Sequence, residues 1–314
     1  MGCRMVYEGL IAALRGAGFG ARLREGEPMA AHTSFAVGGP ADLLVTVETP
    51  DELVQAVCLA REAGVPWRVF GSGTNVLVGD GGVRGLVIVN RCAGFSVADD
   101  GTLRAESGAL LSQVARAVSA QGWAGLAWAV GIPGTVGGAV VNNAGAYGGA
   151  MADRVRSITV LNEGGATEEW DVERLAYSYR SSALKCDPEC GRTRIVLEAV
   201  MALEPGDPEE LAATVRHTEE QRAMRVPAGC CAGSVFKRTL QYPAGFLIEQ
   251  AGLKGRRIGE AQVSPQHANF IMNTGAATAR DVRALIEEVQ HEVFRTFALR
   301  LEPEIQYVGE WSER

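Results

Sequence analysis

Glycine crowds one uncharged stretch of this sequence, Gly131 to Gly149, which reads GIPGTVGGAVVNNAGAYGG. Seven of its nineteen residues are glycine, and no charged residue lies between Gln121 and Asp153. Glycine lets a backbone adopt positive φ and approach a ligand closely, and a bare backbone presents its N–H groups to anions such as phosphate oxygens. The stretch is therefore typical of a cradle for a polyphosphate or a flavin. A buried turn between core strands is the alternative interpretation for part of it.

A second glycine turn, Gly71-Ser72-Gly73-Thr74-Asn75, lies between two apolar runs. It is similar to the GxGxxG fingerprint, but Val76 stands in place of the third glycine, and we expect a strand to follow instead of a helix. The dinucleotide-binding fold that carries this fingerprint is therefore disfavoured. A plain hairpin turn is the alternative.

The uncharged run is long enough to cross a bilayer, and Gly134 with Gly138 forms a GxxxG pair. Pro133 and the pair Asn142–Asn143 interrupt it, however, and no Lys or Arg cluster flanks it. The amino terminus, MGCRMVYEGL, also lacks the apolar core of a signal peptide. We therefore expect a cytoplasmic protein without membrane insertion.

Composition limits the partners further. The 314 residues suffice for two or three domains with their own cores, and the formal net charge of −7 argues against a nucleic-acid partner. A zinc site needs a second ligand pair, and no histidine lies near the pairs Cys186/Cys190 and Cys230/Cys231. The seven cysteines therefore indicate free, reduced thiols and no metal site.

Helix-start signals indicate the elements around these turns. Thr49 is expected to cap one helix, with Pro50 as its first residue and Glu52 closing a capping box. Asp207 is expected to cap a polar helix. Thr278 is expected to cap an amphipathic helix with an inward face of Val282, Leu285, Ile286, Val289 and Val293.

Six sequence blocks occur in order: HTSFAVGGPA, GSGTNVLVGDGG, GIPGTVGGAVVNNAGAYG, YSYRSS, AGSVFKR with AGFLIEQAGLKGRRIGEAQVSPQHANFIMN, and LEPEI. Together they resemble the UDP-N-acetylenolpyruvoylglucosamine reductase family, from His32 to about Gly309. The resemblance implies an α+β fold, with an FAD-binding domain of the PCMH/vanillyl-alcohol-oxidase type made of two α/β subdomains, and then an α+β substrate-binding domain. It implies these boundaries: 1–31 for an N-terminal helical segment, 32–205 for the FAD-binding domain (subdomains about 32–95 and 96–205), and 206–314 for the substrate-binding domain, which ends in the strand that carries Glu304.

The resemblance also implies two half-reactions. NADPH, the co-substrate, reduces a non-covalently bound FAD and leaves. The enolpyruvyl ether of UDP-N-acetylglucosamine then receives a hydride from flavin N5, giving UDP-N-acetylmuramate for peptidoglycan synthesis. The residues implied to hold FAD lie in the two glycine turns: Gly71, Ser72, Gly73, Thr74, Asn75, Pro133, Gly134, Thr135, Gly137, Gly138 and Gly145.

Three residues match the family's catalytic motifs. Arg180, in YRSS, is implied to pair with the substrate carboxylate and to stabilise the enolate beside it. Glu304, in LEPEI, is implied to lie by the same carboxylate and to help when it is protonated. Ser234, in AGSVFK, is implied to protonate the carbanion carbon. Taken alone, these residues would be interpreted as a loop arginine, a solvated edge glutamate and a turn or cap serine.

Further residues fall in blocks that resemble the family's UDP-sugar-binding surface: Lys237, Arg238, Lys254 and His267. The sequence departs from the family pattern here, since Arg238-Thr239 stands where Asn-Pro is common and Cys230-Cys231 where Pro-Ser is common. The short interval from Arg180 to Ser234 resembles the type II subgroup, which lacks a tyrosine loop over the substrate. We expect a monomer.

Two other functions stay open at this point. A flavin-dependent alcohol oxidase on the same scaffold would often tether FAD through a histidine or cysteine, and His32 is the only histidine before the glycine stretch. A catalytically inactive flavin- or nucleotide-binding regulator would keep the glycines and lose Arg180, Ser234 or Glu304, all of which are present.

Overall fold

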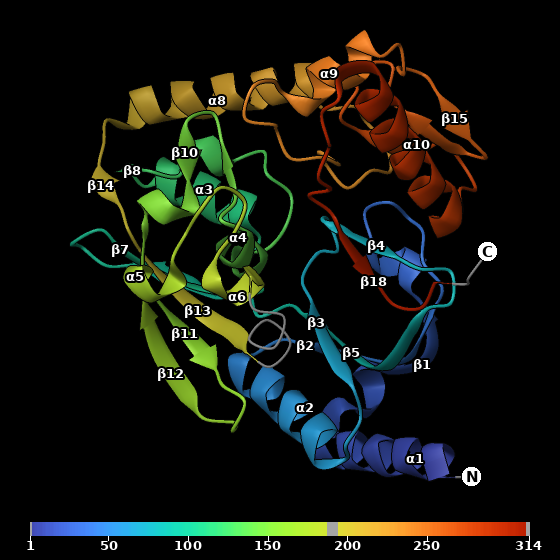
Figure 1. Ribbon diagram of the computed structural model, residues 1–314. Helices are drawn as coiled ribbons and strands as arrows, with labels where there is room; N and C mark the ends of the chain where they lie inside the picture. Colours follow the sequence, from blue (N-terminus) through green and yellow to red (C-terminus); the bar gives the residue numbers. More distant parts are fainter. Residues whose placement is uncertain (1, 187–193, 312–314) are drawn as a thin grey trace. The chain divides into compact units, whose positions relative to one another are not determined.

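The computed structural model describes residues 2–186 and 194–311, which divide into two units (Figure 1). Unit 1 comprises the described residues of Met1–Leu23, Leu44–Gly71 and Leu86–Arg222. Unit 2 comprises those of Arg24–Leu43, Ser72–Gly85 and Ala223–Arg314. Cys190, one of the cysteines considered above, lies outside the described residues.

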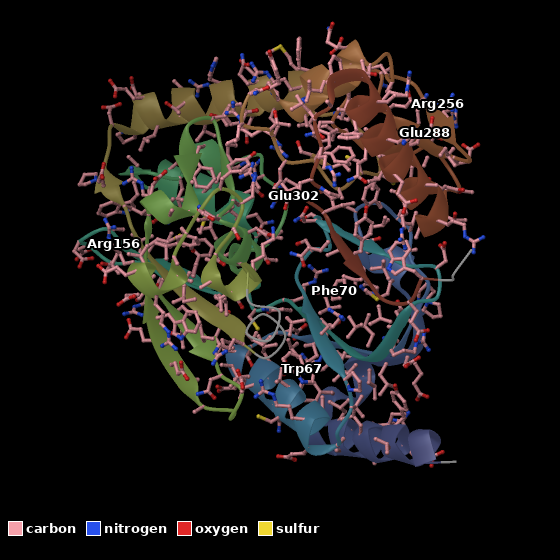
Figure 2. All side chains as sticks on the ribbon, viewed as in Figure 1. Trp67, Phe70, Arg156, Arg256, Glu288 and Glu302 are labelled. Carbon is pink, nitrogen blue, oxygen red and sulfur yellow. The ribbon has the colours of Figure 1, made fainter. Side chains whose placement is uncertain are left out.

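An antiparallel sheet of five strands forms the largest sheet of unit 1 (Figure 1). Its order is β12 (Thr167–Asp171), β11 (Val155–Leu161), β13 (Ile195–Ala202), β7 (Thr102–Glu106) and β6 (Phe95–Val97). Along β11, Ile158 and Val160 are buried while Thr159 between them is half-buried and Arg156, labelled in Figure 2, is exposed. The buried face of the sheet joins residues of α3 (Leu111–Ala120) in the hydrophobic core of this unit.

The remaining elements of unit 1 are short or lie around this sheet. They are α1 (Gly2–Leu14), η1 (Arg15–Phe19), η2 (Gly20–Arg22), α2 (Pro50–Glu62), β3 (Trp67–Phe70), β8 (Trp123–Ala124), η4 (Ala127–Ala129), α4 (Val136–Asn142), β9 (Gly145–Ala146), β10 (Gly149–Ala150), η5 (Met151–Asp153), α5 (Val172–Leu175), α6 (Ala183–Cys186), β14 (Glu204–Pro205) and α8 (Pro208–Arg225), whose last three residues belong to unit 2. Three strands contribute residues to both units: β1 (Leu23–Pro28), β2 (Pro40–Val47) and β5 (Val83–Asn90). Strand β3, whose ends Trp67 and Phe70 are labelled in Figure 2, pairs in parallel with β5.

Helix α2 confirms the expected start and corrects one detail. The hydroxyl of Thr49 accepts the N–H of Glu52 at 3.2 Å, and Pro50 is the first helical residue. The expected capping box is wrong, because the carboxylate of Glu52 accepts from the N–H of Glu48 at 2.8 Å and from the Arg22 guanidinium at 2.6 and 2.7 Å. A bidentate guanidinium is a stronger partner than a backbone N–H. It also holds the pKa of Glu52 below its usual value.

The glycine-rich stretch contains a helix, α4, that the sequence analysis did not anticipate. Two glycines in its first turn disfavour a helix by about 1 kcal/mol each. Val136 and Val140 are fully buried, however, and packing of this kind outweighs propensity in a short helix. Thr135 caps its first turn, and Asn143 ends it with a left-handed backbone (φ 44°).

Unit 2 is built around two small sheets and one long helix. Besides most of β1, its elements are η3 (Met29–His32), β4 (Val76–Val78), α9 (Ala244–Gln250), β15 (Arg257–Ile258), β16 (Ala261–Val263), β17 (Ile271–Asn273), α10 (Ala279–Phe297) and β18 (Gln306–Val308). Strands β15, β16 and β17 form an antiparallel sheet. Strand β4 directly follows the turn at 71–75, as expected, and pairs in parallel with β18.

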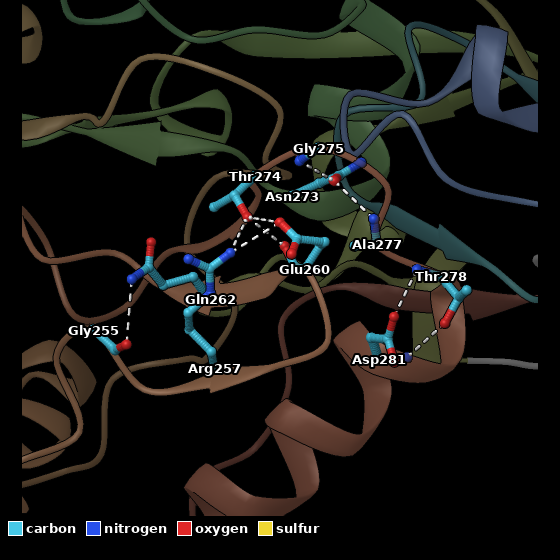
Figure 3. Close-up of polar contacts among 10 residues, drawn as sticks. All are labelled: Gly255, Arg257, Glu260, Gln262, Asn273, Thr274, Gly275, Ala277, Thr278 and Asp281. Atoms are coloured by element: carbon cyan, nitrogen blue, oxygen red, sulfur yellow. Dashed lines mark hydrogen bonds and ion pairs between the residues drawn. The ribbon is translucent and has the colours of Figure 1, made fainter.

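Helix α10 confirms its predicted start and face. Thr278 and Asp281 form a capping box, drawn in Figure 3, and the expected inward residues are all buried. A second cap comes from a distant loop, since the carboxylate of Asp80 accepts from the N–H groups of Ala279 and Arg280 at 2.9 and 3.0 Å. In the described part of the chain, neither α10 nor any other helix has the length and apolar character of a membrane span.

Candidate active site

In unit 1 the turn before α4 is packed against Gly71. A Cβ atom on Gly71 would lie 2.5 Å from Oγ1 of Thr135, so residue 71 must be small for the two segments to touch. Thr135 is 5% exposed, and its hydroxyl accepts the N–H of Gly138 at 3.4 Å. The N–H of Gly137 donates to the carbonyl of Ser107 at 2.8 Å. The two glycine turns predicted from sequence therefore meet within unit 1, through Gly71 and Thr135.

Different structural features require glycine at some of the positions after Pro133. Gly134 has φ 118°, a backbone that side chains rarely adopt. A Cβ atom on Gly145 would lie 2.7 Å from the carbonyl oxygen of Gly149, so this position serves the β9–β10 hairpin. At Gly138, by contrast, a Cβ atom would meet only Oγ1 of Thr135, at an ordinary 3.5 Å. Packing within the described structure therefore leaves the glycine at 138 unexplained.

The rest of the first glycine turn belongs to unit 2. Gly73 has φ 62°, and a Cβ atom there would collide with the carbonyl oxygen of His32. The carbonyl of Gly73 accepts the N–H of Ser34 at 3.1 Å. Asn75 donates from Nδ2 to the carbonyl of Glu304 at 3.3 Å. Thr74, between Gly73 and Asn75, is half-buried. The turn is thus fixed both to the HTSF block and to the segment that carries the predicted catalytic glutamate.

Arg180 lies in a tight turn of unit 1. Ser178 and Ser181 exchange two backbone hydrogen bonds of 3.1 Å, which leaves Tyr179 and Arg180 at the tip. Arg180 has φ 56°, a left-handed backbone that costs a non-glycine residue about 1 kcal/mol. Its guanidinium carbon lies 5.5 Å from the centroid of the Tyr179 ring, and its carbonyl accepts from Nζ of Lys185 at 3.0 Å. Such backbone strain is found most often at functional sites.

Two side chains join this turn to the end of α4. Asn143 donates from Nδ2 to the carbonyl of Ser178 at 2.9 Å. Ser182, which is almost fully buried, donates from Oγ to the carbonyl of Val141 at 2.7 Å. Because α4 begins directly after Thr135, one short helix connects the glycine turn with the turn that presents the arginine.

Ser234 and Glu304 lie in unit 2, on segments that are hydrogen-bonded to each other. The N–H of Glu304 donates to the carbonyl of Val235 at 2.7 Å, and Phe236 pairs with Pro303 in a β-bridge. Both Ser234 and Glu304 are half-buried. The structure therefore pairs the backbone segments that carry the predicted proton donor and the predicted carboxyl group, whereas the predicted catalytic arginine belongs to unit 1.

Two of the predicted substrate-binding cations are paired with carboxylates. Nζ of Lys237 bonds Oε1 of Glu302, which is labelled in Figure 2, and Nζ of Lys254 bonds Oε1 of Glu249 at 2.7 Å. Ion pairs at a protein surface contribute at most about 1 kcal/mol, so a phosphate group could replace either carboxylate at little cost. Arg238 is exposed.

His267 is held as a neutral ring. Its Nδ1 accepts the N–H of Asn269 at 3.2 Å, which leaves the ring proton on Nε2. Burial lowers the pKa of His267 below its usual value. The ring also packs edge-on against Phe270, with centroids 4.9 Å apart. His267 is therefore suited to donate a hydrogen bond from Nε2 and not to supply a charge.

The sequence matches two family models. One is described as FAD binding domain and matches residues 41–170, and the other is described as UDP-N-acetylenolpyruvoylglucosamine reductase, C-terminal domain, and matches residues 226–308. A reductase of this name from Alkaliphilus oremlandii is 43% identical over 90% of this chain and 92% of its own length. UDP-N-acetylenolpyruvoylglucosamine reductase 2 from Symbiobacterium thermophilum is 45% identical over 92% of each chain. This chain belongs to the UDP-N-acetylenolpyruvoylglucosamine reductase family.

A solved structure agrees with the sequence relatives. The reductase from Thermus caldophilus is 36% identical and superimposes with a TM-score of 0.77 over 91% of this chain and 99% of its own. These findings confirm two expectations from the sequence blocks: the family membership and the α+β fold with an FAD-binding domain. Because these relatives are named as reductases, the family favours the reductase over the alcohol oxidase considered above.

As a member of this family, the chain carries residues that fit FAD. The hydroxyl of Ser72, in the first glycine turn, is buried and has no hydrogen-bond partner among the described residues. A buried hydroxyl without a partner is costly unless a ligand supplies one. Gly138 is exposed, and no neighbouring atom of the described structure fills the space beside its backbone. Both positions lie within the residues that match the FAD-binding model. The described residues contain no group of three or more His, Cys, Asp or Glu side chains that could hold a metal ion.

Two residues that hold this family's motifs in place, Asn143 and Asn269, were not predicted from the sequence. For Asn143 a signal existed, because asparagine is one of the few residues that readily adopt a left-handed backbone at the end of a helix. For Asn269, which bonds the backbone of Phe236, no local pattern gives a signal, since 33 residues separate the partners.

Proposed function

We propose that this chain reduces the enolpyruvyl group of UDP-N-acetylglucosamine-enolpyruvate to the lactyl ether, with NADPH as the reductant and FAD as the cofactor. The product is UDP-N-acetylmuramate, a precursor of peptidoglycan. The observation that carries the proposal is the pairing of the Ser234 and Glu304 segments in a chain whose relatives carry the name of this reductase. The proposed enzyme binds no nucleic acid and acts as a cytoplasmic monomer.

The proposal assigns FAD to residues 32–205 and the nucleotide sugar to residues 206–314. The glycine turns would hold the FAD diphosphate through backbone N–H groups and the hydroxyl of Ser72. When bound, FAD supplies hydride transfer, from NADPH to the vinyl carbon of the substrate. The only histidine before the glycine stretch, His32, bonds from Nε2 to Glu27 at 3.1 Å, an arrangement that fits non-covalent FAD.

The remaining chemistry belongs to three side chains. Hydride addition to the vinyl group leaves negative charge on the neighbouring carbon and on the pyruvyl carboxylate. The guanidinium of Arg180 would stabilise this charge, and a protonated Glu304 would assist beside the same carboxylate. The hydroxyl of Ser234 would then transfer its proton to the carbanion carbon, and solvent would return a proton to the serine oxygen.

The UDP-sugar would be held by the cationic and donor groups of unit 2. Lys237 and Lys254 would exchange their carboxylate partners for phosphate oxygens, and Arg238 would add a guanidinium where the family commonly has asparagine. His267 would donate a hydrogen bond from Nε2 to a phosphate or sugar oxygen.

The test is a pair of anaerobic half-reactions on the purified flavoprotein. NADPH should bleach the flavin absorbance, and adding the enolpyruvyl nucleotide should restore it with formation of one lactyl ether per flavin. Acid precipitation should leave the yellow colour in the supernatant. A reduced enzyme that oxygen reoxidises and the enolpyruvyl nucleotide does not would overturn the proposal.

A further inference from the structure

The side chain of Asn269 is buried against the segment that carries Ser234. Asn269 is 8% exposed. Its Oδ1 accepts the N–H of Phe236 at 3.0 Å, and its Nδ2 donates to the carbonyl of the same residue at 2.9 Å. Its backbone carbonyl also accepts the N–H of Val235 at 2.8 Å. One residue thus satisfies three backbone groups within two positions of the predicted proton donor.

The opposite edge of the same segment faces the glutamate. The carbonyl of Val235 accepts the N–H of Glu304 at 2.7 Å, and the N–H of Lys237 donates to the carbonyl of Glu302 at 2.9 Å. Phe236 is bridged to Pro303 without a hydrogen bond between the two, and the N–H and C=O of a residue in such a pair point away from the paired segment. The carboxamide of Asn269 therefore occupies the place that the peptide group of a neighbouring strand would take beside Phe236.

We propose that Asn269 is a positioning residue for the Ser234–Glu304 pair, acting through the backbone of Phe236 and without touching the substrate. This inference rests on the proposed function. A carboxamide offers both a donor and an acceptor in one plane, as a peptide group does. Without these two side-chain bonds the segment can shift slightly against the Glu304 segment, and a displacement of about 1 Å at a reacting group can reduce a rate by roughly 100-fold.

Asn269 also links this pair to His267. Its backbone N–H donates to Nδ1 of the imidazole at 3.2 Å and so fixes the ring proton on Nε2. The backbone of Asn269 therefore orients the His267 ring, and its side chain orients the segment that carries Ser234. A substitution of the Asn269 side chain removes its two bonds to the backbone of Phe236 and keeps the backbone bond to His267. The effect on the Ser234 segment can therefore be tested separately from the effect on the histidine.

The decisive experiment compares the two half-reactions in Asn269→Asp and Asn269→Ser. The aspartate keeps the shape and loses the donor, placing a carboxylate oxygen against the carbonyl of Phe236, and the serine is too short to reach either group. We expect reoxidation by the enolpyruvyl nucleotide to slow by about 10- to 100-fold. Reduction by NADPH should stay within about twofold of wild type, and the solvent deuterium isotope effect on reoxidation should increase, because proton delivery becomes limiting.

The matched control is Asn273→Ala. Asn273, drawn in Figure 3, likewise uses its carboxamide for backbone bonds, donating to the carbonyl of Phe35 at 3.0 Å and accepting from Gly275 and Ala277 at 3.0 and 3.1 Å. Its loss should lower the melting temperature and leave both half-reactions unchanged. The control therefore separates general destabilisation from misplacement of the proton donor.

Three outcomes overturn the inference. If a folded Asn269 variant is reoxidised at a rate within about twofold of wild type, the side-chain bonds to Phe236 are not needed for the reaction. Equal slowing of both half-reactions shows a general structural role. The third outcome concerns the wild-type enzyme. If NADPH reduces it and the enolpyruvyl nucleotide does not reoxidise it, the proposed function itself is overturned. That result differs from an active wild-type enzyme whose Asn269 variants react at the same rate. If the aspartate variant does not fold, the serine variant carries the same comparison.

Discussion

The side chain of Asn143 anchors the turn in which Arg180 adopts a left-handed backbone. Asn143 has a left-handed backbone of its own, and its carboxamide bonds the carbonyl of Ser178 and the N–H of Ala152. Asn143→Ala should lower the free energy of unfolding by about 1–3 kcal/mol, because two hydrogen bonds to backbone groups are lost and each contributes roughly 0.5–1.5 kcal/mol. It should also raise KM for the enolpyruvyl nucleotide by roughly tenfold, because the turn that presents Arg180 loses its anchor. Denaturant unfolding and steady-state kinetics measure the two effects.

The matched variant is Asn143→Gly, which adopts the left-handed backbone without strain and lacks the carboxamide. Both variants should raise KM alike, while alanine should cost about 1 kcal/mol more in stability than glycine. An unchanged KM in both variants would mean that the bond from Ser182 to Val141 holds the turn alone.

Ser234 is the residue whose substitution should separate the two half-reactions most clearly. Ser234→Ala should leave flavin reduction by NADPH within about twofold and slow reoxidation by the enolpyruvyl nucleotide at least about 100-fold, the range expected for losing a general acid. Stopped-flow absorbance of the flavin measures both rates. Ser234→Cys, which keeps a proton donor of similar size, should retain more of the rate. Equal losses in both half-reactions would reject the assigned role.

At the scale of elements, α10 illustrates a helix that is fixed from outside its own sequence. Its capping box is local, but Asp80 adds two further bonds to the first turn across about 200 residues of chain. Asp80→Ala should lower the free energy of unfolding by about 0.5–2 kcal/mol, the usual cost of a lost N-terminal cap. Asp99→Ala, at an exposed loop position, removes the same charge and serves as the control. Equal stability of the two variants would show that Thr278 and Asp281 suffice.

Local signals explain which elements the sequence could predict. The starts of α2, α8 and α10 follow from Thr49, Asp207 and Thr278, each of which accepts backbone N–H groups of its own first turn. The inward face of α10 follows from its helical period. Helix α4 was missed because glycine argues against a helix, and the burial that overrides this preference depends on residues far away in the chain.

The candidate site was predicted to a similar extent. The glycine turns were identified from their residue types, whereas Arg180, Ser234 and Glu304 were singled out only because their blocks resemble the family's motifs. Asn269 and Asp80 were not identified, because their partners lie 33 and about 200 residues away and nothing in their own segments marks them.

At the scale of the whole molecule, the chain builds its units from distant segments. Phe35, Val37 and Leu77 lie in the same hydrophobic cluster as residues of α9 and α10. Unit 2 therefore takes its core from three separate stretches of chain. The same segments carry Gly73 and Asn75, so folding of this core also fixes part of the proposed FAD cradle.

FAD binding should accordingly be visible in the stability of the whole protein. A ligand at 100 times its dissociation constant stabilises the folded state by about 2.7 kcal/mol, so adding FAD to the stripped protein should raise its melting temperature. Gly138 tests whether the glycine turn is the cradle. It is exposed, lies in α4, and has room for a Cβ atom.

Gly138→Ala should therefore leave the stripped protein as stable as wild type or up to about 1 kcal/mol more stable, because alanine favours a helix. It should shrink the FAD-dependent increase in melting temperature, because the new methyl group occupies the space that the cofactor needs. Gly9→Ala is the control, since Gly9 is an exposed glycine in α1 with equally open surroundings, and it should leave that increase unchanged. The same FAD-dependent increase in the Gly138 and Gly9 variants would mean that the cofactor does not approach this backbone, and the glycine at 138 would then have no ligand to explain it.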